Sequence, residues 1–294
     1  MTNFYISKLC HIYDIFVTIF YIYTKSMPNS HMNFSHCKNS SNFAPNFRNI
    51  SMICEYEMNK IHSENLDLIM KLTALGDSII KGVLFTQEEN GKGHYSMSDQ
   101  NIADRVAAGL HCEVLNLGKM GCTIESGERI LDRYLSRLQG TKYVLMCYGG
   151  NDSDYDWKAI ANNPEVEHLP NTSLRLFEKT YVRIINKVRD IGYIPLIMSL
   201  PPMDAQSYFD FVTTTYTDVQ KSNVMKWLKG SVETIWAGHE LYNDAVKRVA
   251  NTTDSMLVDV TTTLGNGKGY LCADGIHPNL AGQSKIASII LRNI

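Results

Sequence analysis

From residue 70 onward, short apolar runs alternate with longer stretches in which apolar residues recur every three or four positions. The short runs are Leu72–Leu75, Glu113–Leu117, Tyr143–Tyr148, Tyr193–Leu200 and Met256–Val260. Runs that are almost continuously apolar and rich in β-branched residues are typical of parallel strands buried on both faces. We therefore expect five strands.

Helical periodicity marks the stretches between and after these runs: 98–109, 123–138, 174–190, 239–250 and 279–291. Gly109 and Gly140 stand where a helix C-terminus favours glycine, and Pro278 suits the first turn of the last helix. Strands that alternate with helices indicate βαβ units with right-handed crossovers and helices on both sheet faces. The pattern predicts an α/β fold, a three-layer α/β/α sandwich around a five-stranded parallel sheet.

Residues 1–69 have no sustained helical or strand period and are rich in Asn, Ser, Met, Tyr and Phe. The apolar stretch Ile15–Tyr23 is far shorter than the ~20 residues of a membrane-spanning helix, and no small-x-small cleavage site follows it. We expect 1–69 to be a disordered leader or a non-native extension with the natural start at Met70. Residues 70–294 then form one domain, cytoplasmic and not bound to a membrane, with a weak N-terminal signal or anchor as the alternative.

Composition narrows the class of protein. The chain is 44% hydrophobic and 20% charged, as in globular proteins with a sizeable core, and its net charge of −2 without a long basic cluster argues against a nucleic-acid partner. Seven cysteines, an odd number at irregular spacing, do not suggest a disulfide framework. Metal-ligand spacings and the phosphate-binding Gly-x-x-x-x-Gly-Lys-Ser/Thr motif do not occur, so we expect neither a metal site nor a phosphate-binding loop of that type.

Two long segments, 153–172 and 203–237, interrupt the alternation just after expected strands. Ligands bind at the carboxyl ends of strands in open α/β sheets, so both segments leave from the expected binding edge. The second segment is rich in aromatic residues: Tyr208, Phe209, Phe211, Tyr216, Trp227 and Trp236. Two interpretations have equal weight, a lid or pocket wall over the site, or a satellite hydrophobic core under a long excursion.

The candidate chemistry begins where the first apolar run stops. That run ends in Gly76-Asp77-Ser78, which places a serine hydroxyl at the mouth of the sheet, although the three residues are also ordinary turn residues. After the last expected strand, Asp274 precedes His277 by three residues in a turn. On a tight turn this spacing lets the carboxylate reach the imidazole and orient it as a base for Ser78.

Two glycine-containing strand ends are candidates for holding a developing oxyanion. One is Gly149-Gly150-Asn151-Asp152, where Asn151 offers an amide N–H and Asp152 can tether the loop. The other is 116–123, where a glycine N–H lies beside a helix start. Each strand end can also be explained as a turn, but their order and placement match a catalytic crevice.

Together these blocks resemble the SGNH hydrolases, also called the GDSL esterase/lipase family, over about residues 70–294. The family letters correspond to Ser78, Gly121, Asn151 and His277; Gly121 is chosen over Gly118 because the family block reads Asn-x-x-x-x-Gly-x-Thr. Ile79-Ile80 follow the serine where the family usually has another small or polar residue. The resemblance implies the flavodoxin-like SGNH hydrolase fold.

It also implies a serine ester hydrolase in which Ser78 forms an acyl-enzyme, Asp274 and His277 supply the base, and Ser78, Gly121 and Asn151 form the oxyanion hole. Such an enzyme needs no metal and no organic cofactor. Family members act on acetylated sugars, lysophospholipids, thioesters and aryl esters. A short acyl ester of a carbohydrate is slightly preferred, because no long aliphatic stripe marks a fatty-acyl groove. The alternatives are an acyltransferase, a lysophospholipase or thioesterase, and a non-catalytic carbohydrate-binding domain; the oligomeric state stays open.

Overall fold

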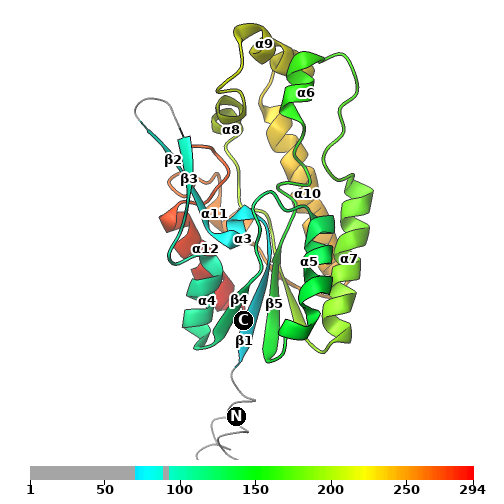
Figure 1. The fold of residues 1–294 in the computed structure, drawn as a ribbon, viewed down its shortest axis with the longest axis vertical. Coiled ribbons are helices and arrows are strands. Elements are labelled where there is room, and N and C mark those ends of the chain that lie inside the picture. The colour runs from blue at the N-terminus through cyan, green and yellow to red at the C-terminus, as the bar shows by residue number, and fades with distance from the viewer. Residues whose placement is uncertain (1–69, 89–92) are drawn as a thin grey trace, which may run out of the picture. The chain divides into compact units, whose positions relative to one another are not determined.

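The computed structural model describes residues 70–88 and 93–294 (Figure 1). The expectations for residues 1–69, a leader with a weak signal or anchor, lie outside the described residues. Within the described ranges, no helix is both long enough and apolar enough to cross a membrane.

The five expected strands form one parallel sheet in the order β4-β1-β5-β6-β7. They are β1 (Lys71–Gly76), β4 (Glu113–Asn116), β5 (Thr141–Cys147), β6 (Ile194–Met198) and β7 (Met256–Val258). Strand β4 lies on one side of β1, and β5 and the later strands lie on the other. The chain therefore changes direction across the sheet between β1 and β5, where doubly wound sheets leave a crevice at their carboxyl ends.

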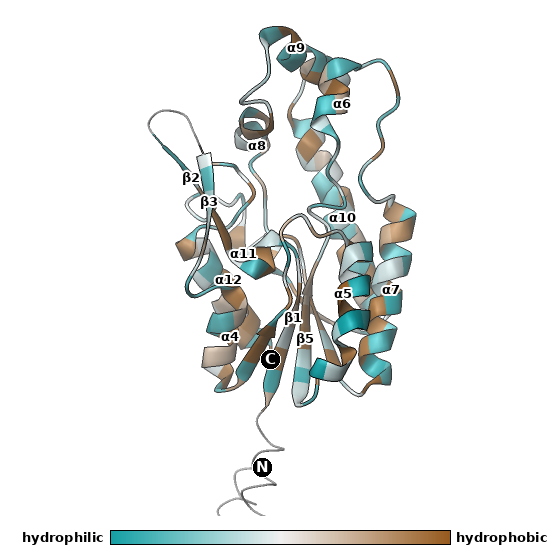
Figure 2. Cartoon of the chain, viewed as in Figure 1, coloured by the Kyte–Doolittle hydropathy of each residue, from teal (hydrophilic) through white to brown (hydrophobic). Residues whose placement is uncertain are grey.

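Helices cover both faces of the sheet, as the sequence predicts (Figure 1). One face carries α5 (Ile124–Tyr134, continued by the 3₁₀ turn η2, Leu135–Arg137), α7 (Leu174–Asp190) and α10 (Glu233–Thr252); the other carries α4 (Ile102–Leu110), α11 (Val260–Leu264) and α12 (Leu280–Asn293). Strand β5 shows the alternation: Val144 and Met146 pack in the first core, Leu145 and Cys147 in the second. Figure 2 shows the same apolar interior between polar outer helix faces. The three-layer α/β/α prediction is confirmed.

Several predicted boundaries are wrong for local physical reasons. Helix α4 does not stop at Gly109; it ends at Leu110, and His111 takes the left-handed cap conformation (φ 53°). Gly109 instead permits close packing of α4 on α12, because a Cβ there would lie 2.5 Å from Leu291 Cδ1. Helix α10 begins at Glu233, inside the segment predicted to be an insert.

An antiparallel hairpin that the sequence pattern did not predict follows the short helix α3 (Ser78–Lys81). It consists of β2 (Val83–Gln87) and β3 (Gly93–Met97), outside the main sheet. Every residue of β3 is exposed, so this strand lacks the near-continuous apolar run that marks the buried strands of the sheet. The Asn90-Gly91 pair between the strands is the usual turn signal of a hairpin and could have found it.

The two predicted insertions pack on each other. They contain α6 (Trp157–Asn162), α8 (Ala205–Val212) and α9 (Asp218–Trp227), which share a third hydrophobic cluster with the start of α10. Trp157, Tyr208 and Phe209 are buried in that cluster, as the satellite-core interpretation requires. Phe211 stays half-buried and faces the β2–β3 hairpin. The role of a lid stays a prediction.

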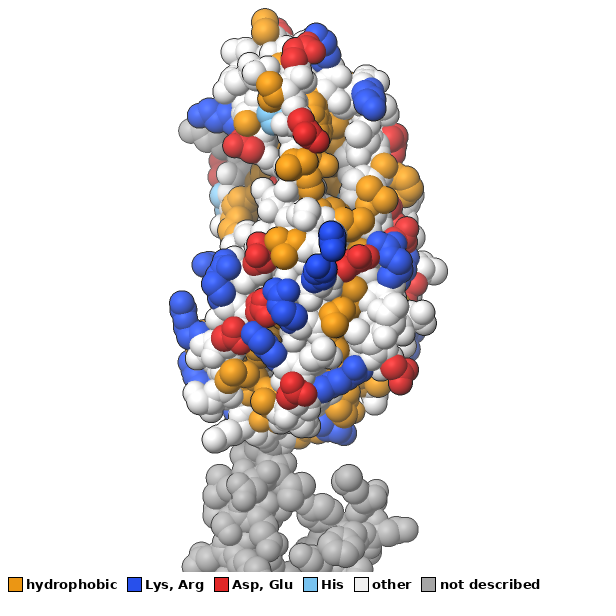
Figure 3. Space-filling view, turned by 90° about the vertical axis from the view of Figure 1, so that its right-hand side faces the viewer, with side chains coloured by type: hydrophobic (Ala, Val, Ile, Leu, Met, Phe, Trp, Pro, Cys, Tyr) orange, Lys and Arg blue, Asp and Glu red, His pale blue; other side chains and the backbone are white. Residues whose placement is uncertain are grey.

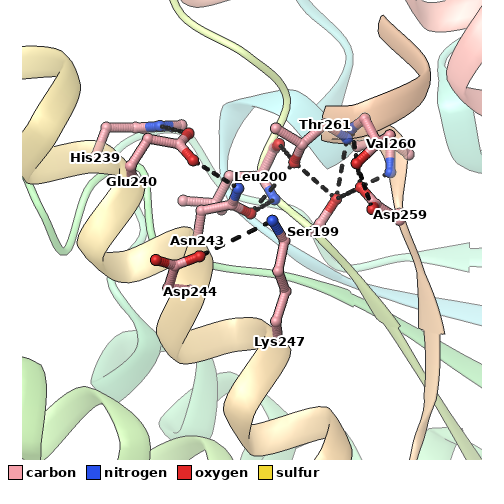
Figure 4. A network of polar contacts seen from close by, with 11 residues as sticks. Ser199, Leu200, His239, Glu240, Asn243, Asp244, Lys247, Asp259, Val260 and Thr261 are labelled. Carbon is pink, nitrogen blue, oxygen red and sulfur yellow. Dashed lines mark hydrogen bonds and ion pairs between the residues drawn. The ribbon is translucent and has the colours of Figure 1, made fainter. Parts of the chain in front are cut away.

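A polar network fastens the carboxyl ends of β6 and β7 to helix α10 (Figure 4). The fully buried Asn243 accepts from the Leu200 N–H (3.0 Å) through Oδ1. Ser199 Oγ accepts from the N–H groups of Val260 (2.9 Å) and Thr261 (3.1 Å). These bonds satisfy backbone groups that the sheet leaves unpaired at this edge.

On the outer surface, the face that includes α5 and α7 carries interleaved positive and negative side chains (Figure 3). Arg183 and Lys187 of α7 pair with Glu128 of α5, at 2.7 Å and 3.1 Å, and Lys187 also pairs with Asp132 at 2.7 Å. The positive side chains of α7 are thus paired with the negative side chains of α5. Surface pairs of this kind contribute ~0–1 kcal/mol each to stability.

Candidate active site

Ser78 lies at the carboxyl end of β1, immediately after a very close turn. A Cβ at Gly76 would lie 2.8 Å from the carbonyl oxygen of Cys147 and 2.5 Å from Ile80 Cγ1, so only glycine lets β1 pass β5 into α3 here. Asp77 caps α3 by accepting from the Ile79 N–H at 2.9 Å. Ser78 is the first residue of α3, with 7% of its surface exposed.

The structure brings His277 onto Ser78, from which it is 199 residues away in the chain, and places Asp274 on the other ring nitrogen of His277. His277 Nε2 lies 2.8 Å from Ser78 Oγ, and His277 Nδ1 lies 2.6 Å from Asp274 Oδ2. Asp274 is fully buried, and only 3% of His277 is exposed. When Nδ1 donates to the carboxylate, Nε2 is left as an acceptor for the serine hydroxyl, which is the geometry that general-base activation requires.

The turn that holds this pair is built from its own backbone. Asp274 Oδ1 accepts from the N–H groups of His277 (3.1 Å) and Ile276 (3.3 Å), while the Cys272 N–H donates to the His277 carbonyl at 2.7 Å. Asn279 caps α12, so Pro278 precedes the cap; its expected place in the first helical turn is wrong. Because the candidate acid and the candidate base belong to one hydrogen-bonded turn, their relative position is fixed by local contacts.

Asn151 follows β5 and is oriented by Asp77. Its side-chain Nδ2 donates to Asp77 Oδ2 at 3.1 Å, and its backbone carbonyl accepts from Asn171 Nδ2 at 2.9 Å. Burial raises the pKa of the Asp77 carboxyl from 3.8 to about 6, against the lowering effects of the Ile79 N–H, His277 and Asn151. Asp77 is therefore a structural link between the serine turn and the Asn151 loop.

Gly121 lies in the loop after β4, with a φ of +69° that favours glycine. The Lys119 N–H of this loop donates to the Gly76 carbonyl at 3.1 Å. Asp152 holds the start of α5, which directly follows this loop, because its carboxylate oxygens accept from the Ile124 N–H at 3.0 and 3.1 Å. Over residues 70–88 and 93–294, neither the Ser78 N–H nor the Gly121 N–H donates a hydrogen bond to another group.

Asp152 is fully buried, and this burial raises the pKa of its carboxyl from 3.8 to about 6, while hydrogen bonds oppose the shift. Sequence reasoning expected Asp152 to tether the Asn151 loop. The structure adds that it joins this loop to the start of α5, directly after the Gly121 loop.

Sequence reasoning missed one residue beside the base. Tyr95 of strand β3 presents its ring to His277 with centroids 5.6 Å apart and an interplanar angle of 70°. Burial, with Asp274 nearby, raises the pKa of the Tyr95 phenol to about 12. An exposed strand on an unpredicted hairpin gave no pattern that would have singled out Tyr95.

A separate cavity of about 790 Å³ borders the turn that holds His277. Its lining includes Asp204, Trp236, Glu240, Cys272 and Gly275, but neither Ser78 nor His277. No group of three or more His, Cys, Asp or Glu side chains is placed to hold a metal ion in the part of the chain that the structure describes. The expectation of no cofactor stays a prediction.

Comparison with protein-family models gives a match over most of the chain. A sequence model of the GDSL-like Lipase/Acylhydrolase family matches residues 74–285. No curated protein sequence matches the chain significantly.

Similar solved structures share the fold. They include a variant of an acetyl-xylooligosaccharide esterase from Geobacillus stearothermophilus, with 17% identity, a TM-score of 0.51, and coverage of 76% of this chain and 93% of that one. An α/β-hydrolase enzyme from the metagenome of Lake Arreo, Spain, has 20% identity, a TM-score of 0.51, and coverage of 76% and 94%. A carbohydrate acetylesterase from Sinorhizobium meliloti has 12% identity, a TM-score of 0.52, and coverage of 76% and 97%. The family match over most of the chain shows that it belongs to the GDSL-like lipase/acylhydrolase (SGNH hydrolase) family and is a carboxylic ester hydrolase of that type.

Proposed function

We propose that this protein hydrolyses short acyl esters, with O-acetylated carbohydrates as the preferred class, through an acyl-enzyme at Ser78. The observation that carries the proposal is the continuous chain of short contacts from Ser78 Oγ through His277 to Asp274, at 2.8 and 2.6 Å. A hydroxyl, an imidazole and a buried carboxylate in this order have the geometry of an activated nucleophile.

In the first half-reaction, Ser78 Oγ attacks the ester carbonyl carbon while His277 Nε2 takes its proton. The tetrahedral intermediate collapses when His277 returns that proton to the leaving alcohol, and acyl-Ser78 remains. Water then attacks the acyl carbonyl, His277 takes a proton from the water, and the serine regains its proton as the acid leaves. Asp274 keeps the imidazole in the required tautomer and stabilises the imidazolium.

The negative charge on the carbonyl oxygen needs donors that are already in place. Three groups are proposed for this role: the Ser78 N–H, the Gly121 N–H and the Asn151 side-chain amide. They follow β1, β4 and β5, which are adjacent parallel strands, so all three groups come from loops at the same carboxyl edge of the sheet. The Ser78 and Gly121 N–H groups donate no internal hydrogen bond among the described residues, and the Asn151 amide has a second N–H besides the one that donates to Asp77, so no internal hydrogen bond has to break when the oxyanion forms.

Two observations support the proposed substrate class. The sequence has no long aliphatic stripe that would line a fatty-acyl groove, which favours a short acyl group. Two proteins with the same fold are named as esterases of acetylated saccharides, which supports a carbohydrate alcohol. Transfer of the acyl group to a sugar acceptor would use the same acyl-enzyme, so a product assay with added methyl xyloside separates transfer from hydrolysis.

The test combines active-site labelling with kinetics. A fluorophosphonate should label the wild-type chain and the Ser288→Ala control, which removes an exposed serine on α12, but not Ser78→Ala. Hydrolysis of p-nitrophenyl acetate should follow the same pattern, and Asp274→Asn should lower kcat by on the order of 10³–10⁴. Full labelling and turnover in Ser78→Ala would refute the proposed nucleophile, and faster hydrolysis of palmitate than of acetate would refute the short-acyl preference.

A further inference from the structure

Three aromatic side chains from separate elements form a continuous wall beside the candidate base. Phe85 of β2 lies 5.3 Å from Tyr95 of β3 and 5.1 Å from Phe211 of α8, measured between ring centroids. Tyr95 and Phe211 are 6.4 Å apart at 80°, so each ring contacts the other two. Tilted and edge-on contacts at these distances are favourable for aromatic rings.

The wall is anchored to the turn that carries His277. The Phe85 N–H donates to Cys272 Sγ at 3.5 Å, and Cys272 lies in the same turn as the Asp274–His277 pair. Gly93 accommodates the Phe85 ring, because a Cβ at that position would lie 2.1 Å from Phe85 Cζ. The position of the wall is therefore coupled to the position of the base.

Tyr95 is the member of the wall nearest the chemistry. Its ring meets the imidazole of His277 at 5.6 Å, yet 42% of its surface remains exposed. An aromatic ring that contacts the base and is still open to solvent leaves a surface for a ligand to cover. A phenol with a pKa of about 12 also stays protonated at neutral pH, so its hydroxyl can donate to a ligand oxygen.

The chemistry of ester cleavage decides which part of the substrate meets this wall. His277 must give its proton to the oxygen of the departing alcohol, so the alcohol lies within hydrogen-bond reach of Nε2. The acyl oxygen instead points to the donors after β1, β4 and β5. A wall in contact with His277 therefore borders the alcohol and not the acyl chain.

We infer that Phe85, Tyr95 and Phe211 form the alcohol subsite, in which Tyr95 stacks against the flat C–H face of a sugar ring whose hydroxyl carries the acetyl group. This inference rests on the proposed function of Ser78. A pyranose suits the subsite because its C–H face is apolar and its edge carries hydroxyl groups. The Tyr95 ring and hydroxyl offer a matching apolar face and polar tip.

The experiment uses substrate pairs that differ only in the alcohol or only in the acyl group. Each pair is assayed with the wild type, Tyr95→Ala and Tyr95→Phe. Acetylated methyl xyloside and ethyl acetate share the acyl group; p-nitrophenyl acetate and butyrate share the alcohol. Tyr95→Ala should lower kcat/KM for the acetylated sugar by on the order of tenfold, mainly through KM, with a smaller loss for ethyl acetate. The acetate-to-butyrate ratio should not change, and Tyr95→Phe should recover most of the loss.

Trp236→Ala is the matched control, because Trp236 is similarly exposed (46%) but lines the separate cavity of about 790 Å³. The ratio of kcat/KM for the acetylated sugar to kcat/KM for ethyl acetate is the quantity compared. A fall of this ratio in Trp236→Ala and not in Tyr95→Ala would overturn the inference and place the alcohol in that cavity. An equal loss on both acetate esters in Tyr95→Ala would also overturn it. Fluorophosphonate labelling of Ser78 in every variant distinguishes these results from failure of the proposed function, in which no variant and no wild-type protein would be labelled.

Discussion

Asn151 Nδ2 donates to Asp77 Oδ2 at 3.1 Å, which joins the loop after β5 to the residue just before Ser78. The other oxygen of the same carboxylate caps α3 through the Ile79 N–H. One buried carboxylate thus orients both the turn that presents the serine and the amide proposed to bind the oxyanion. A carboxylate is suited to this place because it only accepts hydrogen bonds, and both neighbours are donors.

Asp77→Asn should lower kcat without a matching change in KM. The new amide has one oxygen, which can face either the Ile79 N–H or Asn151 Nδ2 but cannot replace both carboxylate oxygens. The Asn151 amide therefore loses the contact that orients it. Displacement of one oxyanion donor should reduce kcat by on the order of 10–10² for p-nitrophenyl acetate. Asp190→Asn, at an exposed residue at the end of α7, is the control; an Asp77→Asn enzyme as active as that control would contradict this role.

Asn151→Ala removes the proposed donor itself. Because the amide would act on the oxyanion and not on the ground-state ester, kcat should fall by on the order of 10²–10³ with KM nearly unchanged. Steady-state kinetics and the rate of fluorophosphonate labelling should both fall, with an unchanged melting temperature to show that the fold is intact. A large rise in KM at constant kcat would instead indicate a role in binding the substrate.

Asp152 makes the stability of the protein depend on pH in a predictable direction. Its carboxyl has a pKa of about 6 in the folded chain, raised from 3.8 chiefly by burial. The folded state therefore holds a proton that the unfolded state releases between about pH 4 and 6. The stabilising contribution of this group is complete below pH ~4 and is lost as the pH rises through 6.

Asp152→Asn removes this titration, and its side-chain oxygen can still accept from the Ile124 N–H. Relative to wild type, the free energy of unfolding of the variant should therefore rise between pH 4 and 7, by on the order of 2–3 kcal/mol. Urea denaturation at pH 4, 5, 6 and 7 measures the difference, with Asp190→Asn as the exposed control. A difference that stays constant with pH would show that Asp152 titrates alike in both states.

Gly76→Ala should destabilise the fold and displace Ser78. The added methyl would lie 2.8 Å from the Cys147 carbonyl oxygen, and a backbone atom in the centre of the sheet cannot move aside cheaply. We expect a loss of about 1–3 kcal/mol in the free energy of unfolding, together with lower esterase activity. Gly238→Ala is the matched control: no atom lies within 4 Å of the new Cβ in α10, so stability should rise by about 0.5–1 kcal/mol. Equal effects of the two changes in denaturant unfolding would contradict the packing argument.

Asn243→Ala tests the network at the ends of β6 and β7 (Figure 4). The change leaves the buried N–H of Leu200 without its acceptor, which should cost about 1–3 kcal/mol of unfolding free energy. Asn251→Ala, on the exposed part of the same helix, should change stability by less than about 0.5 kcal/mol. Chemical denaturation measures the free energy of unfolding of both variants. An unchanged value for Asn243→Ala would contradict the prediction and would mean that water replaces the lost acceptor.

The hairpin and the Asp77–Asn151 contact show where sequence reasoning stops. The pattern of apolar runs predicts strands that are buried on both faces, and β2 and β3 are not such strands. Asp77 could be assigned to a turn from its neighbours, but its second partner is 74 residues away in the chain. A contact of that kind depends on which strands are adjacent, and the pattern of runs does not specify strand order.

The sequence by itself determined the layers, the five strands and the blocks that identify the family, because strand and helix periods and short motifs are local properties of the chain. It also placed the candidate acid and base on one turn, since three residues separate Asp274 from His277. Only the tertiary structure decided the strand order β4-β1-β5, which places the loops that carry Gly121, Ser78 and Asn151 beside one another at the carboxyl edge of the sheet. The aromatic wall on His277 likewise comes from packing, because its three rings lie on elements whose positions are set by long-range contacts.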